Sequence, residues 1–184
     1  MSDPLGGADR LLVLRHAGHA LVRVVGRGTF KISGALKEFV GRALDDRDAG
    51  VVVDLEACTG MDSTFMGVIA GLAMRLKKAS GGRVILANVN NRLSELLSTL
   101  GLSLLVEVLP PGQAEGKLGS LLAQANGLVA VGGASKENTA SVMLEAHENL
   151  VRASPDNLPK FKDVLEYLRA DVERKKTPAG GNPS

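Results

Sequence analysis

The sequence predicts an α/β protein in which helices pack on a β-sheet whose central strands run parallel. Two observations lead to this prediction. Short apolar runs suited to buried strands alternate along the chain with segments in which apolar residues recur at helical spacing. Beyond residue 111 the helical spacing predominates, so we expect a helical extension to follow the sheet.

The first expected elements are a hairpin and a helix. Residues 11–14 and 20–25 are apolar and flank an Ala-Gly turn signal, which predicts a β-hairpin. An approximate helical stripe of apolar residues follows over residues 30–43. Three consecutive valines then open residues 51–55, and such a run is typical of an interior strand covered by helices.

Helices and strands continue to alternate after this buried strand. A tight connection over residues 59–63 leads to the next helix. The elements expected from there on are a helix with its apolar face over residues 65–76, a strand over residues 84–87, a helix over residues 92–100 and a last strand over residues 104–109. We expect residues 51–55 and 84–88 to be neighbouring strands, with the helix that begins near Asp62 packed on one side of them.

The segment after Pro111 is expected to be mainly helical. Residues 114–125 have helical spacing, and residues 127–133 are apolar and contain glycine, which leaves a hinge or a short strand open. The spacing over residues 135–176 predicts a helical hairpin. Its second helix is expected to bury four side chains, Leu158, Phe161, Leu165 and Leu168.

These patterns divide the chain into three parts. Residues 10–111 are expected to form the sheet domain and residues 112–176 the helical C-terminal extension. Residues 177–184 contain two prolines and two glycines and are expected to be a disordered tail.

Composition excludes several classes of protein. The chain has 184 residues, a formal net charge of +2 and 3% aromatic residues, so neither bulk positive charge nor stacking platforms indicate a nucleic-acid binder. Its longest apolar run, residues 63–74, is shorter than the roughly 20 residues that cross a membrane, and the N-terminus lacks the apolar core of a signal peptide. A single cysteine, Cys58, excludes an internal disulfide and fits a reducing compartment, so we expect a cytoplasmic protein.

The most informative stretch begins with the strand at residues 51–55. An Asp-Ser-Thr loop at residues 62–64 lies between that strand and the following helix, and Gly101 ends the helix before the last strand. In these features the sequence resembles the STAS domain of bacterial anti-sigma factor antagonists, over residues 10–110. The resemblance implies a STAS-like mixed β-sheet with helices packed on it, to which this chain adds a C-terminal helical hairpin.

The resemblance also implies a function and a site. In this family the second hydroxyl residue after the aspartate accepts a phosphate, which corresponds to Thr64, with Ser63 as the alternative. The implied partner is an anti-sigma factor of the serine/threonine kinase type, and a phosphatase restores the unmodified state. Binding of the unmodified protein frees a sigma factor, so the implied role is phosphorylation-controlled regulation of transcription. The residues expected to contact the partner are Asp62, Ser63, Thr64, Phe65 and Met66, of which Phe65 stands where the family usually has glycine.

The chemistry of the loop suits this role. Asp62 or Ser63 is a candidate N-cap, whose side-chain oxygen accepts a hydrogen bond from a free backbone N–H of the helix. Thr64 then lies in the first turn, where the helix dipole and unpaired N–H groups favour a phosphate, and we expect it to be exposed. A phosphate there adds a charge of about −1.5 to −2, which opposes burial against a partner.

Other functions stay open from the sequence. An enzyme with Ser63 or Thr64 as nucleophile needs a nearby base, and the motif contains no histidine, so catalysis is not expected. No cofactor or metal is expected either, because no third glycine completes a dinucleotide fingerprint and the three histidines lack a familiar metal-ligand spacing. The binding alternative is a STAS interaction module of a transporter or a sensory complex. A homodimer held by the helical hairpin is also left open.

Overall fold

The computed structural model of the protein describes residues 9–131 and 138–176. Its strands are β1 (Arg10–His16), β2 (His19–Gly28), β3 (Gly50–Asp54), β4 (Cys58–Met61), β5 (Val84–Ala87), β6 (Glu107–Leu109) and β7 (Val129–Val131). Its α-helices are α1 (Phe30–Asp45), α2 (Ser63–Ser80), α3 (Asn91–Thr99), α4 (Gln113–Leu122), α5 (Thr139–Ala153) and α6 (Leu158–Lys176). Short 3₁₀ turns cover Leu102–Leu104, Ala123–Gly127 and Pro155–Asn157.

The described strands form a mixed sheet with a parallel centre. Their order is β6-β5-β3-β2-β1-β7, and β4 pairs with the C-terminal end of β2. Parallel pairing joins β2 to β3, β3 to β5 and β5 to β6, whereas β1 is antiparallel to both β2 and β7. The predicted hairpin, the parallel centre and the neighbouring position of β3 and β5 are therefore confirmed.

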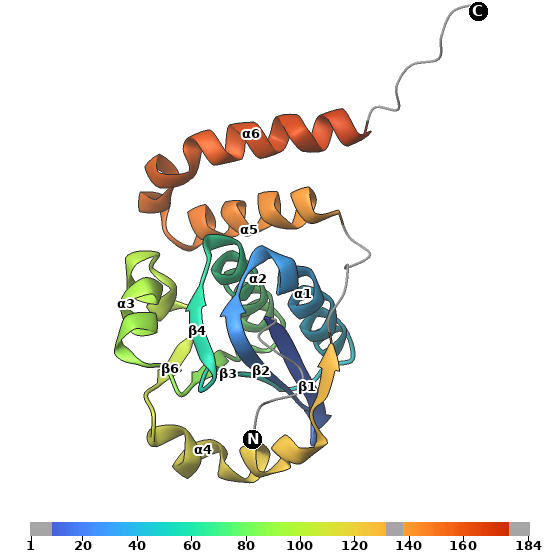
Figure 1. The fold of residues 1–184 in the computed structure, drawn as a ribbon, viewed down its shortest axis with the longest axis vertical. Coiled ribbons are helices and arrows are strands. Elements are labelled where there is room, and N and C mark those ends of the chain that lie inside the picture. Colours follow the sequence, from blue (N-terminus) through green and yellow to red (C-terminus); the bar gives the residue numbers. More distant parts are fainter. Residues whose placement is uncertain (1–8, 132–137, 177–184) are drawn as a thin grey trace, which may run out of the picture.

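Helices cover both faces of the sheet, and the two faces bury separate cores (Figure 1). The larger core lies under α1, α2 and α3, and the fully buried side chains that these helices give to it include Leu36, Phe65, Ile69 and Leu93. The smaller core lies on the other face, where α4 packs against Leu21 and Val52. Because successive strand residues point to opposite faces, the neighbouring Val22 and Val53 serve the larger core.

Two helices form further layers on the side of the larger core. Figure 1 shows α5 lying across α2, and α6 lying over α5 as the layer farthest from the sheet. The predicted helical hairpin is thus confirmed from Thr139 onwards, while its first expected residues, 135–137, lie outside the described residues. The expected tail at residues 177–184 also lies outside them. The division of the chain into domains stays a prediction.

Some strand boundaries differ from the sequence prediction. β4 is an unpredicted strand: its residues Cys-Thr-Gly-Met lack β-branched alternation, and a register shift interrupts their pairing with β2. The last strand is shorter than residues 104–109, because a 3₁₀ turn occupies Leu102–Leu104 and β6 begins at Glu107. Of the two alternatives for residues 127–133, the described part contains the strand, β7.

The burial of α6 agrees with the prediction for some of its residues. Leu165 and Leu168 are buried, and Phe161 is half-buried against the ring of His147. The prediction for Leu158 is wrong, because this side chain is 48% exposed. Leu158 is the first residue of α6 and lies beside the turn that joins it to α5, so solvent reaches it.

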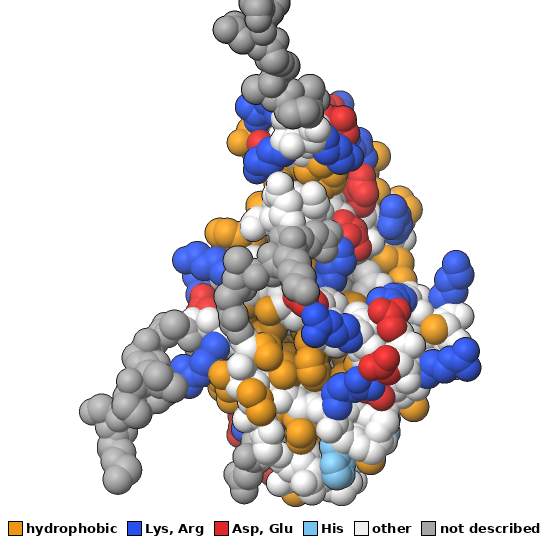
Figure 2. Space-filling view, turned by 90° about the vertical axis from the view of Figure 1, so that its right-hand side faces the viewer, with side chains coloured by type: hydrophobic (Ala, Val, Ile, Leu, Met, Phe, Trp, Pro, Cys, Tyr) orange, Lys and Arg blue, Asp and Glu red, His pale blue; other side chains and the backbone are white. Residues whose placement is uncertain are grey.

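The described surface is polar with charges of both signs. None of the helices in residues 9–131 and 138–176 combines the length and apolar character needed to cross a bilayer. In Figure 2, Lys and Arg side chains lie close to Asp and Glu side chains, and hydrophobic side chains gather in a hollow between them. Arg15, for example, lies 2.6 Å from Asp46 and 2.7 Å from Asp48. Exposed pairs of this kind contribute little to stability.

Truncation of Leu165 should destabilise the protein more than truncation of Leu158, because Leu165 is 3% exposed and Leu158 is 48% exposed. Removing a buried leucine side chain costs about 2–5 kcal/mol, so Leu165→Ala should lower the free energy of unfolding in urea by about 2 kcal/mol or more. Leu158→Ala, on the same helix, is the control and should cost less than about 1 kcal/mol. Equal losses in the two variants would contradict the packing of α6 on α5.

Candidate functional site

The Asp-Ser-Thr loop lies where two strands end and two helices begin. β4 pairs with β2 so that Met61 lies opposite Gly28, and the backbone N–H of Asp62 donates to the Gly28 carbonyl at 2.9 Å. Shortly after these strand ends, α1 begins at Phe30 and α2 begins at Ser63. Both helices therefore begin just after the paired C-terminal ends of β2 and β4.

The carboxylate of Asp62 caps both helices. Its Oδ1 accepts a hydrogen bond from the backbone N–H of Phe65 at 2.8 Å, which makes Asp62 the N-cap of α2. Its Oδ2 accepts from the backbone N–H of Phe30 at 2.8 Å, in the first turn of α1. The N-cap residue of α1, Thr29, makes no side-chain capping bond within the described part of the chain. Asp62, not Ser63, is therefore the cap, and its negative charge lies at two positive helix ends.

Ser63 contacts a helix from the C-terminal part of the chain. Its Oγ lies 3.0 Å from Nε2 of His147 on α5. The other ring nitrogen of His147, Nδ1, lies 2.7 Å from the carbonyl oxygen of Met143. Because a carbonyl only accepts, Nδ1 carries the proton, and in the neutral ring Nε2 accepts the hydrogen bond that the Ser63 hydroxyl donates. His147 is buried, and its ring meets that of Phe161 edge-on with 5.0 Å between centroids.

Thr64 lies in the first turn of α2, but it is buried. The residue is 3% exposed, so the expectation of an exposed hydroxyl is wrong. Thr64 shares a helix face with Val68 and Gly71, which line the space between α1, α2 and α5. The helices α1 and α5 that line this space come from distant parts of the chain, so the local sequence does not indicate this burial.

Phe65 and Met66 point into the core. Phe65 is fully buried and Met66 is 5% exposed. Gly28 leaves room for the ring of Phe65, since a Cβ built at position 28 would lie 2.6 Å from the ring atom Cδ1. Phe65 in place of the usual glycine is therefore a packing residue of the larger core. Of the five residues expected to contact a partner, Asp62 and Ser63 keep partial exposure, and partner contact by this set stays a prediction.

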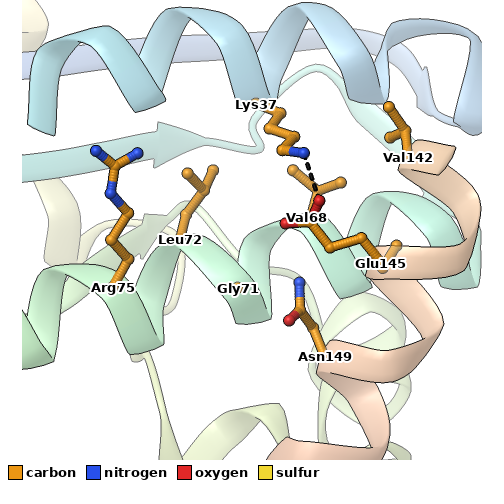
Figure 3. Close-up of a pocket in the computed structure, with 9 residues that line it drawn as sticks. Lys37, Val68, Gly71, Leu72, Arg75, Val142, Glu145 and Asn149 are labelled. Carbon is orange, nitrogen blue, oxygen red and sulfur yellow. Dashed lines mark hydrogen bonds and ion pairs between the residues drawn. The ribbon is translucent and has the colours of Figure 1, made fainter. Parts of the chain in front are cut away.

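A small cavity of about 80 Å³ lies beside the site, between α1, α2 and α5 (Figure 3). Lys37 of α1 and Glu145 of α5 form an ion pair there, drawn as the dashed line. Asn149 of α5 points towards α2, and its Nδ2 donates to the carbonyl oxygen of Gly67 at 3.4 Å. Ligand pockets are typically about 300–1,000 Å³, so this cavity suits a few water molecules rather than an organic cofactor.

The chemistry available to the site is hydroxyl, carboxylate and imidazole. Among the described residues, no group of three or more His, Cys, Asp or Glu side chains is arranged to hold a metal ion. His147 is the residue that the sequence alone does not bring to the loop. The one hint in the sequence is the pair Gly67 and Gly71, whose spacing of four residues indicates a bare helix face that a second helix can approach.

Comparison with known proteins agrees with the fold. A family model of the STAS domain matches residues 11–113. A solved structure from Thermotoga maritima, described as an anti-sigma factor antagonist, is 15% identical with a TM-score of 0.50, and the match covers 62% of this chain and 92% of that one. An anti-sigma factor antagonist from Mycobacterium paratuberculosis is 24% identical with a TM-score of 0.48, and the match covers 68% of this chain and 99% of that one. Comparison with curated proteins gives no match.

Replacement of Asp62 should destabilise two helices at once. Loss of an N-cap costs about 0.5–2 kcal/mol, so Asp62→Ala, which removes the acceptors for Phe65 and Phe30, should lower the free energy of unfolding by about 1–4 kcal/mol. Asn90→Ala is the matched control, because Asn90 caps α3 alone through the N–H of Leu93. A denaturant titration in which Asp62→Ala costs no more than Asn90→Ala would contradict the double cap.

Proposed function

The chain belongs to the STAS domain family, and we propose that it works as an anti-sigma factor antagonist. In this proposal the unmodified protein binds an anti-sigma factor of the serine/threonine kinase type in the cytoplasm, and the sigma factor held by that partner is released. The observation that carries the proposal is the family match over residues 11–113, with the Asp-Ser-Thr loop at the start of α2. The anti-sigma factor antagonist described from Thermotoga maritima, similar in fold, supports it.

The proposed switch is phosphorylation of Thr64, with Ser63 as the alternative acceptor. The kinase transfers the terminal phosphoryl group of ATP to the hydroxyl oxygen: a new P–O bond forms, the bond to ADP breaks and the hydroxyl proton is released. The product carries a charge of about −1.5 to −2 in the first turn of α2, where the helix dipole favours it. The same charge opposes a dry contact with a partner, and a phosphatase that removes it restores binding.

A binding role is proposed in preference to catalysis, although the contact of Ser63 with His147 favours an enzyme as the second candidate. The Nδ1 of His147 is held by the Met143 carbonyl and not by a carboxylate. His147 is 3% exposed, so a substrate does not reach its imidazole with α5 in place.

A fluorophosphonate probe, which labels activated serine nucleophiles, distinguishes the two candidates. The protein should stay unlabelled over the time in which a serine hydrolase control reacts completely, because the His147 imidazole is enclosed. Labelling of Ser63 that disappears in His147→Ala would support the enzyme instead.

The phosphate acceptor is tested with the anti-sigma kinase of the same organism and ATP. Mass spectrometry should find one phosphate, on Thr64, and Thr64→Ala should bind the kinase but resist release by ATP. Thr64→Glu should bind at least tenfold more weakly, about 1.4 kcal/mol, because it places a charge where the contact must be dry. Ser63→Ala serves as the matched control for the neighbouring hydroxyl. Phosphate only on Ser63, or a Thr64→Glu protein with unchanged affinity, would refute the assignment.

A further inference from the structure

α5 lies against α2 more closely than side chains on both helices would allow. A Cβ built on Gly67 would lie 2.2 Å from the carbonyl oxygen of Ala146, and a Cβ built on Gly71 would lie 2.3 Å from Nδ2 of Asn149. A side chain at position 67 would push α5 away, because the atoms it meets are backbone, whereas a side chain at position 71 would displace the side chain of Asn149. The face of α2 that carries the two glycines is therefore shaped for a helix, and α5 of the same chain occupies it.

Of the two candidate phosphate acceptors next to this face, Thr64 is buried, whereas Ser63 keeps partial exposure. The Ser63 hydroxyl is engaged by His147 of α5 at 3.0 Å, and Thr64 is 3% exposed. Phosphoryl transfer requires the attacking oxygen to line up with the terminal phosphate of ATP, which a kinase cannot arrange around a buried hydroxyl. With α5 in place, Thr64 is closed to modification.

The contact that holds α5 is partly polar. The apolar side chains that α5 buries in the larger core are Val142, Ala146 and Leu150. Beside them lie three polar links: the ion pair of Lys37 with Glu145, the Ser63–His147 hydrogen bond and the long hydrogen bond from Asn149 to Gly67 (Figure 3). The contact between α2 and α5 therefore combines an apolar part, which belongs to the larger core, with polar links that single substitutions can break.

We propose that α5 is an autoinhibitory element of this chain. Docked on α2, it closes Thr64 to a kinase, engages the Ser63 hydroxyl through His147 and occupies the face that a partner needs. Displaced, it frees both hydroxyls and that face. The identity of the partner rests on the proposed function, whereas the docking of α5 does not. A phosphate on Thr64 and a docked α5 exclude each other, because a buried site that is 3% exposed does not accept an unpaired double charge.

The accessibility of position 64 tests the docking without any partner. Thr64→Cys is made in the full chain, and mass spectrometry follows the labelling of the new thiol by N-ethylmaleimide. Labelling should be slow, and at least tenfold faster when Ala146→Glu is added, because Ala146 is fully buried and a carboxylate there disfavours docking. Ala170→Glu, at an exposed position of α6, is the matched control and should leave the rate unchanged.

The native Cys58 reports whether the sheet domain stays folded in these variants. It is 4% exposed, and burial raises the pKa of its thiol, so it reacts only if the domain unfolds. Should Ala146→Glu expose both thiols, Glu145→Lys replaces it, since this change places a second positive charge opposite Lys37 without entering the core. Labelling at position 64 that is slow in the parent and fast in the loosened variant, with Cys58 protected in both, supports the docking. Equal rates in the parent, Glu145→Lys and Ala170→Glu proteins would overturn it.

A disulfide between α2 and α5 separates this inference from the proposed function. A Cβ at position 71 would lie 3.0 Å from Cγ of Asn149, and a disulfide places Cβ about 3 Å from the far sulfur, so Gly71→Cys with Asn149→Cys should lock α5 in place. With the anti-sigma kinase and ATP, the oxidised protein should gain at least tenfold less phosphate than the reduced protein. Equal phosphorylation of the two states overturns the autoinhibition and leaves the proposed function intact. Absence of phosphate in both counts against the proposed function, while the labelling rates still decide the docking.

Discussion

One carboxylate joins the two helix N-termini at the strand ends where the site is built. The N-termini of α1 and α2 both carry partial positive charge and free N–H groups, and the two would repel each other at this distance without an anion between them. Asp62 supplies that anion, with one oxygen for each helix. The position of the two helices over the larger core, and with it the place of Ser63 and Thr64, follows from this shared cap.

The C-terminal helices change the character of that site. The family match ends at residue 113, so the face of α2 belongs to the STAS domain, whereas the helix that covers it belongs to the extension. What an isolated domain would present to solvent is here an internal contact between helices. The contact depends on the absence of side chains at Gly67 and Gly71 as much as on any side chain that is present.

The parts of this arrangement that local sequence determines were predictable. β3 and β5 are short apolar runs, and an aspartate directly before an apolar helical face indicates a cap. The burial of Thr64 beside the contact of α2 with α5 was not predictable, because that contact relies on glycines and a backbone carbonyl, which leave no hydrophobic pattern. The inward position of Phe65 similarly depends on the bare backbone of Gly28 on another strand. β4 escaped prediction because pairing with β2, and not its own composition, makes it a strand.

The strand β7 gives the C-terminal helices a fixed point of attachment. It pairs with β1 up to Val131, and α5 begins at Thr139, while beyond α5 the Nδ2 of Asn157 donates to the Leu100 carbonyl at 2.9 Å. In the proposed autoinhibition, α5 competes as an intramolecular ligand with any protein that binds the same face of α2. For any protein that binds the same face, the apparent dissociation constant is multiplied by one plus the ratio of docked to undocked α5. Changes in the attachments of α5, at β7 or at Asn157, therefore alter the affinity for a partner without altering any contact with that partner.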